Sequence, residues 1–427
     1  MGRHLRGGPW FSLSVLEEAM KHSTAPAVAP VIFIALVLAA IPAAFAQESE
    51  PLTLAQALQQ GKTSLQLRLS YDNADVAGNP TDSATQLSLR TRLGYRTAEW
   101  SGFAMFLQFQ DVSAAIRTYA PLDPEYDTIN DPEVATVHQA YLEYAALPGS
   151  TVRVGRQEFR LENGRLLSES PWRQQGQAFD AASISSKSID KLALIAAYAN
   201  KMLNSSAQFV DFEHFVFIDA DYTGLENQHL YAHAFWLDNI ERTARIDTAT
   251  FGIRASGDFE AFEYQGDYNI QQKYADAEGG GGDMISGFAA IKFGEFRAGP
   301  GYTKISGADG KDHAFDTLIG TTHQFQGFAN VFAGTNGAGV VNGVVEYYVL
   351  VGGTHGGARW QVSHHILNQE SQDQAYGDEN DARIIYTYDE NLTLSAEVGL
   401  YAASTDNEST LGTADKTVWT LRSDYRF

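Results

Sequence analysis

Residues Thr85–Tyr95 read TQLSLRTRLGY, a stretch in which apolar and polar side chains alternate. In an extended chain, successive side chains point to opposite faces of the strand. One face therefore carries the apolar side chains of Leu87, Leu89, Leu93 and Tyr95. The opposite face carries the polar side chains of Gln86, Ser88, Arg90 and Arg92. This pattern indicates a strand with apolar surroundings on one side and water on the other.

The same alternation recurs along most of the chain, for example in 64–71, 259–269, 359–365 and 392–401. Many of these segments run about nine to eleven residues, the length that crosses a bilayer at a tilt. A soluble sandwich usually has shorter strands and does not need charges on the second face of so many of them. We therefore predict an all-β fold, a transmembrane antiparallel up-and-down β-barrel that is closed because hydrocarbon cannot pair an open edge.

The strand number follows from a count of the alternating segments. About seventeen are visible, and the ambiguous stretch Phe209–Asp221 adds one. Single-chain bacterial barrels have even strand numbers, so we predict 18 strands, with 16 as the alternative. Short links such as Gly257-Asp258 and Glu390-Asn391 are expected as periplasmic turns. Longer polar stretches are expected as extracellular loops, namely 115–132, 278–283, 307–316 and 404–415.

The N-terminus has the pattern of a secretory signal peptide. Met20-Lys21-His22 precedes the apolar run Val31–Ile41 and the small-residue cleavage pattern Ala44-Phe45-Ala46. An anchoring helix is the alternative, but this apolar run is too short to span a bilayer. We expect residues 1–46 to be removed, with Met20 as a possible true start, and residues 47–427 to form the barrel.

The last segment, Thr417–Phe427 (TVWTLRSDYRF), alternates and ends on an aromatic residue. A closing strand with a terminal aromatic resembles the signal read by the outer-membrane barrel-assembly machinery. Together with the signal peptide, it predicts a barrel in the bacterial outer membrane, with lipid and the assembly machinery as partners.

Composition excludes several other classes of protein. The chain has 30 Lys and Arg against 52 Asp and Glu, a formal net charge of −22, which argues against a nucleic-acid partner. It has no cysteine, so disulfides and thiolate metal sites are excluded.

Against this acidic background, the segment Thr151–Asp180 (TVRVGRQEFRLENGRLLSESPWRQQGQAFD) contains five arginines. Val152 and Val154 continue an outward face, which turns Arg153 inward. We expect Gly155 to bend the strand, so that Arg156 also faces the lumen. Gly164 and Pro171 break the segment further on, which is expected to place Arg160, Arg165 and Arg173 on a loop or inward fold.

This segment resembles the alginate-export family of outer-membrane proteins. The resemblance rests on Gly155-Arg156-Gln157, Arg165, Trp172-Arg173-Gln174 and Phe179-Asp180, and on a second block, Phe315–Phe332 (FDTLIGTTHQFQGFANVF). It extends from about Leu65 to Phe427. It implies an 18-stranded barrel, and in the best-known member of the family a polyuronate passes through an arginine-lined constriction.

The arginines on polar strand faces and on the expected inward loop are therefore candidates for binding an anion. A guanidinium is permanently charged and holds a carboxylate through two parallel hydrogen bonds. The candidate pore-lining residues are Arg153, Arg156, Arg165, Arg173, Arg90, Arg92, Arg254 and Arg359. Further lumenal cations are expected at Arg68, Arg383 and Arg422.

We thus expect a monomeric channel that passively conducts an anionic polysaccharide or a related small anionic solute. Glu158, Glu162, Glu169 and Asp180 nearly balance the five arginines of their segment. The alternative is therefore a structural lattice of ion pairs in a general porin or in a structural barrel without cargo selectivity.

No cofactor, metal site or enzymatic activity is expected. His364 and His365 are adjacent on a strand and point to opposite faces, so they cannot bind one metal ion together. No Gly-x-Ser-x-Gly motif is present. The acidic stretches 123–133 and 309–316 lack a full calcium-loop pattern and are expected to be solvated.

Overall fold

The computed structural model describes residues 52–240, 247–275, 281–308, 314–332 and 340–427. The predicted signal peptide, residues 1–46, lies outside the described residues, as do residues 276–280 and 309–313 of two expected loops. The described chain begins with the short helix α3 (Leu54–Gln59), whose N-terminus is capped by Thr53 and Gln56. Among the described residues, no helix is both long and apolar enough to cross a bilayer.

Eighteen strands follow the helix, in the order of the sequence. They are β1 (Lys62–Val76), β2 (Ala84–Arg96), β3 (Phe103–Thr118), β4 (Val134–Leu147), β5 (Ser150–Gln157), β6 (Ala178–Ile189), β7 (Leu192–Leu203), β8 (Phe209–Tyr222), β9 (Gln228–Asn239), β10 (Thr248–Asp258), β11 (Phe262–Lys273), β12 (Gly281–Phe293), β13 (Phe296–Ile305), β14 (Val344–His355), β15 (Ala358–Asn368), β16 (Ala375–Thr387), β17 (Leu392–Ala403) and β18 (Lys416–Arg426). The predicted number of 18 is confirmed, and the ambiguous stretch Phe209–Asp221 is β8.

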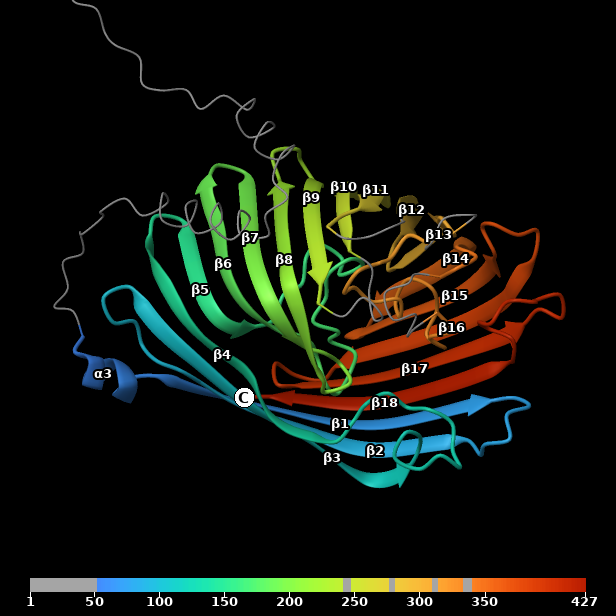
Figure 1. Ribbon diagram of the computed structural model, residues 1–427, viewed down its shortest axis with the longest axis horizontal. Coiled ribbons are helices and arrows are strands. Elements are labelled where there is room, and N and C mark those ends of the chain that lie inside the picture. The colour runs from blue at the N-terminus through green and yellow to red at the C-terminus, as the bar shows by residue number, and fades with distance from the viewer. Residues whose placement is uncertain (1–51, 241–246, 276–280, 309–313, 333–339) are drawn as a thin grey trace, which may run out of the picture. The chain divides into compact units, whose positions relative to one another are not determined.

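The sheet closes on itself. Each strand pairs antiparallel with the next, and β18 pairs back onto β1, with Leu67 opposite Tyr425. Figure 1 shows β1 lying between β2 and β18. Closure leaves no strand edge with unpaired backbone groups, which is the condition for a sheet in hydrocarbon. The predicted antiparallel up-and-down barrel is therefore confirmed.

The two faces of the wall are sorted as the alternation predicts. On β2, Arg90 and Arg92 are 4% and 7% exposed, whereas Leu89 and Leu93 are 42% and 52% exposed. The same sorting holds on β10, where Arg254 is buried and Ile253 is exposed. The apolar side chains thus cover the outside of the barrel, and the polar side chains point into the lumen.

The connections differ between the two ends of the barrel. At one end they are short, and four of them, 148–149, 190–191, 294–295 and 356–357, have two residues each. The expected turn at Glu390-Asn391 lies at this end, and the turn after β10 begins directly beyond Gly257-Asp258. The longest connections, 119–133, 158–177 and 306–343, all leave the opposite end.

Part of the lumen is filled by an apolar core. Leu166 and Leu167 of loop 158–177 pack with Phe315 and Ile319 of segment 314–332. This cluster also includes inward-facing aromatic residues of β8 and β9, namely Phe215, Phe217 and Phe235. Phenylalanines on the lumenal face weaken the polar–apolar alternation of β8, because the inserted segments and neighbouring wall residues bury them rather than water.

The sorting of faces predicts a clear labelling result, because the natural chain has no cysteine. In Ser256→Cys, the new thiol should face the lumen and react with a membrane-impermeant maleimide. In Ile253→Cys, on the same strand, the thiol should face outward and be protected in liposomes. Equal labelling of the two positions in folded protein would contradict the assignment of faces.

Candidate functional site

Loop 158–177 is held against one side of the lumen by wall arginines. Arg68 Nη1 donates to the carbonyl oxygens of Pro171 and Arg173, at 2.8 and 3.2 Å. Arg90 Nη1 donates to the carbonyls of Arg173 and Gln174, each at 3.4 Å. These two predicted lumenal cations therefore position the backbone of the loop.

A second attachment lies at the start of the same loop. Glu158 Oε1 is 3.1 Å from Arg92 Nη1 and 2.7 Å from His138 Nε2. Burial alone would raise the pKa of the Glu158 carboxyl, but the His138 hydrogen bond and the Arg92 charge outweigh it and lower the pKa to about 2. The Glu158 carboxylate therefore stays ionised through the neutral and mildly acidic range.

The two sequence blocks that stand out by resemblance meet inside the lumen. The rings of Trp172 and His323 stack with centroids 4.1 Å apart, and Trp172 Nε1 donates to Thr321 Oγ1 at 3.0 Å. Leu167 and Ile319 form a parallel β-bridge between loop 158–177 and segment 314–332. Blocks separated by more than a hundred residues thus build one inward structure.

Segment 314–332 is attached to the wall at β16 and β17, which lie on the other side of β18 from β1. The backbone N–H of Phe328 donates to the carboxylate of Asp381, and that of Ala329 donates to Glu379. His323 Nε2 lies 2.9 Å from Glu397 Oε2 on β17. Both inward segments are therefore fixed by polar contacts to strands.

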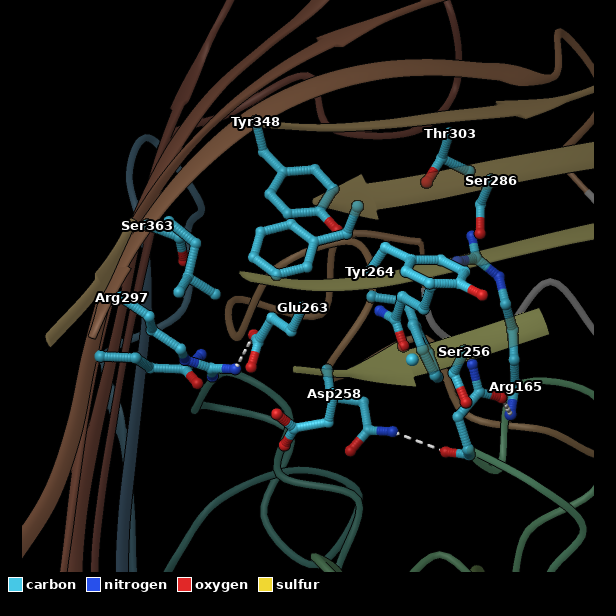
Figure 2. Close-up of a pocket in the computed structure, with 18 of the residues that line it drawn as sticks. Arg165, Ser256, Asp258, Glu263, Tyr264, Ser286, Arg297, Thr303, Tyr348 and Ser363 are labelled. Atoms are coloured by element: carbon cyan, nitrogen blue, oxygen red, sulfur yellow. Dashed lines mark hydrogen bonds and ion pairs between the residues drawn. The ribbon is translucent and has the colours of Figure 1, made fainter. Parts of the chain in front are cut away.

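A cavity of about 810 Å³ lies beside these segments. Its wall carries the aromatic side chains of Phe288 and Tyr348, which stack with centroids 5.9 Å apart. Phe325 and Phe328 line it from segment 314–332. Hydroxyl and amide groups complete the lining, among them Gln265, Ser286, Thr303, Gln361 and Ser363; Figure 2 shows Tyr348, Ser363 and Thr303 around this space.

Arg165 is the charged group of loop 158–177 at this cavity (Figure 2). Its side chain is buried, and its guanidinium lies 4.7 Å above the Phe325 ring. Within the described part of the chain, Arg165 Nε and Nη2 have no hydrogen-bond partner and no carboxylate pairs with this arginine. The two other arginines of the lining are paired, Arg297 with Glu263 and Arg383 with Glu397.

Comparison with known proteins places this arrangement in a family. The family model described as alginate export matches residues 58–291, which is more than half of the chain. The chain belongs to the alginate export family. A search among curated proteins finds no match.

Solved structures of outer-membrane channels share the fold. Pseudomonas aeruginosa OccK9 (OpdG) superposes with a TM-score of 0.68 at 14% identity, covering 87% of this chain and 99% of that chain. Acinetobacter baumannii OccAB2 and P. aeruginosa OpdK, the latter crystallised with vanillate, give TM-scores of 0.65 and 0.64. Both are 14% identical, with the same coverage of 87% and 99%.

Family and fold together identify a channel barrel of the bacterial outer membrane. The family and the fold are those of outer-membrane channels rather than of enzymes. The outside of the barrel is accordingly its lipid-facing surface.

Within this alginate export barrel, four of the predicted arginines lie as expected on the lumenal side or on the inward loop. Arg153 on β5 pairs with Glu143 at 2.8 Å. Arg254 on β10 donates to Gln265 at 2.7 Å. Arg173 lies on the loop, stacks on Trp172 at 3.9 Å and donates to the carbonyl of Asn130 at 3.0 Å. Arg359 is exposed near the short-turn end of β15, on the same face as the lumenal Ser363.

Arg156 lies on the other face of the wall from the one we expected. It forms a bidentate ion pair with Asp180, at 2.6 and 3.0 Å, and lies 4.8 Å from the exposed ring of Phe209. Gly155 has a φ of +127°, but the alternation continues through it. Arg153 and Gln157 face inward, and Arg156 between them faces outward. The expectation that Gly155 turns Arg156 into the lumen is not met.

Most lumenal arginines are paired with carboxylates, as the ion-pair alternative anticipates. Arg68 pairs with Asp424 at 2.7 Å and Arg422 with Asp72 at 3.6 Å, in addition to the pairs above. This lattice spans neighbouring strands and loop 158–177. Arg165 stands apart from it.

Sequence reasoning missed the aromatic lining of the cavity. Tyr348 and Phe288 lie on inward faces, where only polar residues were expected. Their alternation with outward Tyr347 and Ile285 gives no clear signal, because the lumenal faces of these strands mix apolar, aromatic and polar residues.

The contacts of Glu158 with Arg92 and His138 predict that a mutation of Glu158 measurably destabilises the folded protein. Glu158→Gln removes the charge that pairs with Arg92 and His138, and should lower the free energy of unfolding by roughly 1–3 kcal/mol. Urea unfolding in detergent, followed by tryptophan fluorescence, measures this difference. Glu133→Gln is the matched control, because its partner Arg117 is exposed and such pairs contribute roughly 0–1 kcal/mol.

The contribution of Glu158 to the free energy of unfolding should decrease as the pH falls. The pKa of Glu158 is depressed in the folded protein, so its contribution is present above the ordinary carboxyl pKa, near pH 4.5, and is lost as the pH falls toward 2. The difference between wild type and Glu158→Gln should be constant from pH 7 to about pH 4.5 and shrink below. A difference that grows on acidification contradicts the assigned attachment.

Proposed function

We propose that this barrel passively conducts an anionic carbohydrate, or a related small carboxylate, across the outer membrane. The observation that carries the proposal is the buried guanidinium of Arg165 beside the cavity of about 810 Å³. A buried cation without an acidic partner is costly, and an anionic solute would supply the missing partner.

The chemistry of the lining supports a carboxylate attached to a ring. A guanidinium binds a carboxylate through two parallel hydrogen bonds, which fixes its orientation. The faces of Phe325 and Tyr348 offer flat apolar surfaces for a sugar or aromatic ring. The hydroxyls of Ser286, Thr303 and Ser363 offer partners for ring hydroxyls.

The size of the cavity supports a short cargo segment. Ligand pockets for small molecules have volumes on the order of 300–1,000 Å³, and the cavity falls within that range. One sugar-acid unit or a small aromatic acid fits this space. The OpdK structure with vanillate is a case of a related barrel fold with a small aromatic carboxylate.

The other lumenal cations assist as an electrostatic path. Arg173 of the inward loop and Arg153, Arg90, Arg92, Arg254 and Arg359 of the wall give the constriction its basic groups. The carboxylates that pair with Arg92 and Arg153 weaken the hold of these two arginines on a passing anion. Weak successive sites favour conduction, because a solute that binds too tightly does not leave.

A channel without cargo selectivity is the second candidate. It is favoured by the pairing of most lumenal arginines, such as Arg68 with Asp424 and Arg153 with Glu143. In that case the lattice stabilises and narrows the barrel, and Arg165 has no role in transport.

The two candidates differ in the response of single channels to glucuronate. Glucuronate should block the wild-type current in a planar bilayer, whereas uncharged glucose should not. Arg165→Gln should weaken the block roughly 10- to 100-fold, as expected for the loss of a charge-assisted hydrogen-bond pair of about 1.5–3 kcal/mol.

Arg156→Gln is the matched control, because it also removes one arginine from the same family pattern but from the outer face. Its block by glucuronate should equal that of wild type. If wild type shows large currents that neither acid nor sugar blocks, the channel is a non-selective porin. If Arg156→Gln has the larger effect, the role given to Arg165 is wrong.

A further inference from the structure

Three side chains with metal-ligating atoms meet at the lumenal wall, on the side of loop 158–177 away from Glu158. They are Glu162 of the loop, Asp219 of β8 and His233 of β9, and their ligand atoms all lie within 4.8 Å of one another. Asp219 and His233 are directly opposite each other on neighbouring strands. Asp219 and His233 are 7% and 8% exposed, so this group is withdrawn from the open lumen.

The orientation of the histidine ring is set by its second nitrogen. His233 Nε2 lies 2.6 Å from Asn269 Oδ1, while Asn269 Nδ2 donates to Asp267 Oδ2 at 3.4 Å. The Asn269 oxygen thus needs a proton on His233 Nε2, which leaves Nδ1 to face Glu162 Oε1 at 2.5 Å. A metal-binding histidine characteristically donates its other ring N–H to such an oxygen.

Gly252 makes this arrangement possible. It is the residue opposite both His233 and Asn269 in the sheet. A Cβ at this position would lie 2.3 Å from His233 Nε2 and 1.9 Å from Asn269 Oδ1. The glycine therefore leaves the space in which the ring and the amide contact each other.

Asp219 has a buried carboxylate oxygen that is open to a further ligand. Its Oδ2 is buried and has no hydrogen-bond partner within the described residues. His233 does not donate a hydrogen bond to this oxygen, because its two ring nitrogens face Glu162 and Asn269. The neighbouring cation Arg254 lies 3.9 Å from Glu162 Oε2 and donates to Gln265. A buried carboxylate oxygen without a donor, beside a second carboxylate and an imidazole nitrogen, forms a set of ligand atoms that a further cation would complete.

We propose that Glu162, Asp219 and His233 bind one divalent transition-metal ion, with Zn²⁺ as the representative. Two carboxylate oxygens and one imidazole nitrogen form a mixed set that Zn²⁺ accepts, with a fourth position for water. Ca²⁺ fits less well, because it takes six to eight oxygen ligands. The bound ion joins loop 158–177 to β8 and β9, and so holds the loop that carries Arg165.

This site is independent of the proposed cargo, and it was not visible in the sequence. Its three ligands lie 57 and 14 residues apart along the chain, without any metal-binding spacing. The barrel brings them together because β8 and β9 pair and the loop inserts between them and the lumen.

The test measures Zn²⁺ binding to the folded, detergent-solubilised chain without a histidine tag. Equilibrium dialysis followed by elemental analysis should give one Zn²⁺ per chain. Asp219→Asn and His233→Gln should each weaken binding at least tenfold, because each removes one ligand. X-ray absorption at the zinc edge should show nitrogen and oxygen neighbours at about 2.0–2.2 Å.

His365→Gln is the matched control. His365 also lies between two carboxylates, Glu346 at 2.7 Å and Asp381 at 3.4 Å, but these face different ring nitrogens and share no ligand point. This variant should bind Zn²⁺ as wild type does. The proposal is overturned if folded wild type retains no stoichiometric Zn²⁺, or if Asp219→Asn and His233→Gln both bind it with wild-type affinity.

Discussion

The constraint on which the structure depends is that hydrocarbon offers no hydrogen-bond partner to the backbone. Every N–H and C=O of the wall must then pair within the sheet, and the pairing of β18 with β1 completes that requirement. Once the sheet is closed, each strand has a lipid face and a lumenal face, and side chains alternate between them. Arginines such as Arg90 and Arg92 can belong to a membrane protein because this alternation takes them inside.

The lumen poses a second problem, which is how to bury many charges and two inserted segments together. Arginines of the wall stabilise the buried charges by pairing with carboxylates on adjacent strands. They also hold loop 158–177 by donating hydrogen bonds to its backbone carbonyls. The loop in turn contacts the wall through Glu158, whose carboxylate binds Arg92 on β2 and His138 on β4. An apolar cluster around Leu167, Ile319 and Phe215 fills part of the space between the inserted segments and the wall. Loop 158–177 is therefore held in the lumen by polar contacts to the wall and by apolar packing.

Several lumenal arginines pair with carboxylates of the wall, whereas Arg165 lies at the cavity. Arg68, Arg153 and Arg422 have acidic partners that hold them in the wall. Arg165 is carried by the loop to the cavity, where its guanidinium lies over the Phe325 ring and pairs with no carboxylate of the described residues. At the neighbouring cluster of Glu162, Asp219 and His233, the group without a partner among the described residues is instead a carboxylate oxygen of Asp219. The same inserted loop thus carries Arg165 of the proposed anion site and Glu162 of the proposed metal site, three residues apart.

The alternation in the sequence determined the closed barrel of 18 strands and the inward position of Arg90, Arg92, Arg153 and Arg254, because the side-chain period is a local property. Short motifs such as Trp172-Arg173-Gln174 indicated the family. The alternation did not determine the side on which Arg156 lies, since a glycine at +127° can either break or keep the alternation, and only pairing with Asp180 decides. Nor did it reveal that Arg165 lies at the cavity without a carboxylate partner among the described residues, or that Glu162 lies beside Asp219 and His233. Those features depend on where two inserted segments come to rest, and that position is set by contacts between residues far apart in the chain.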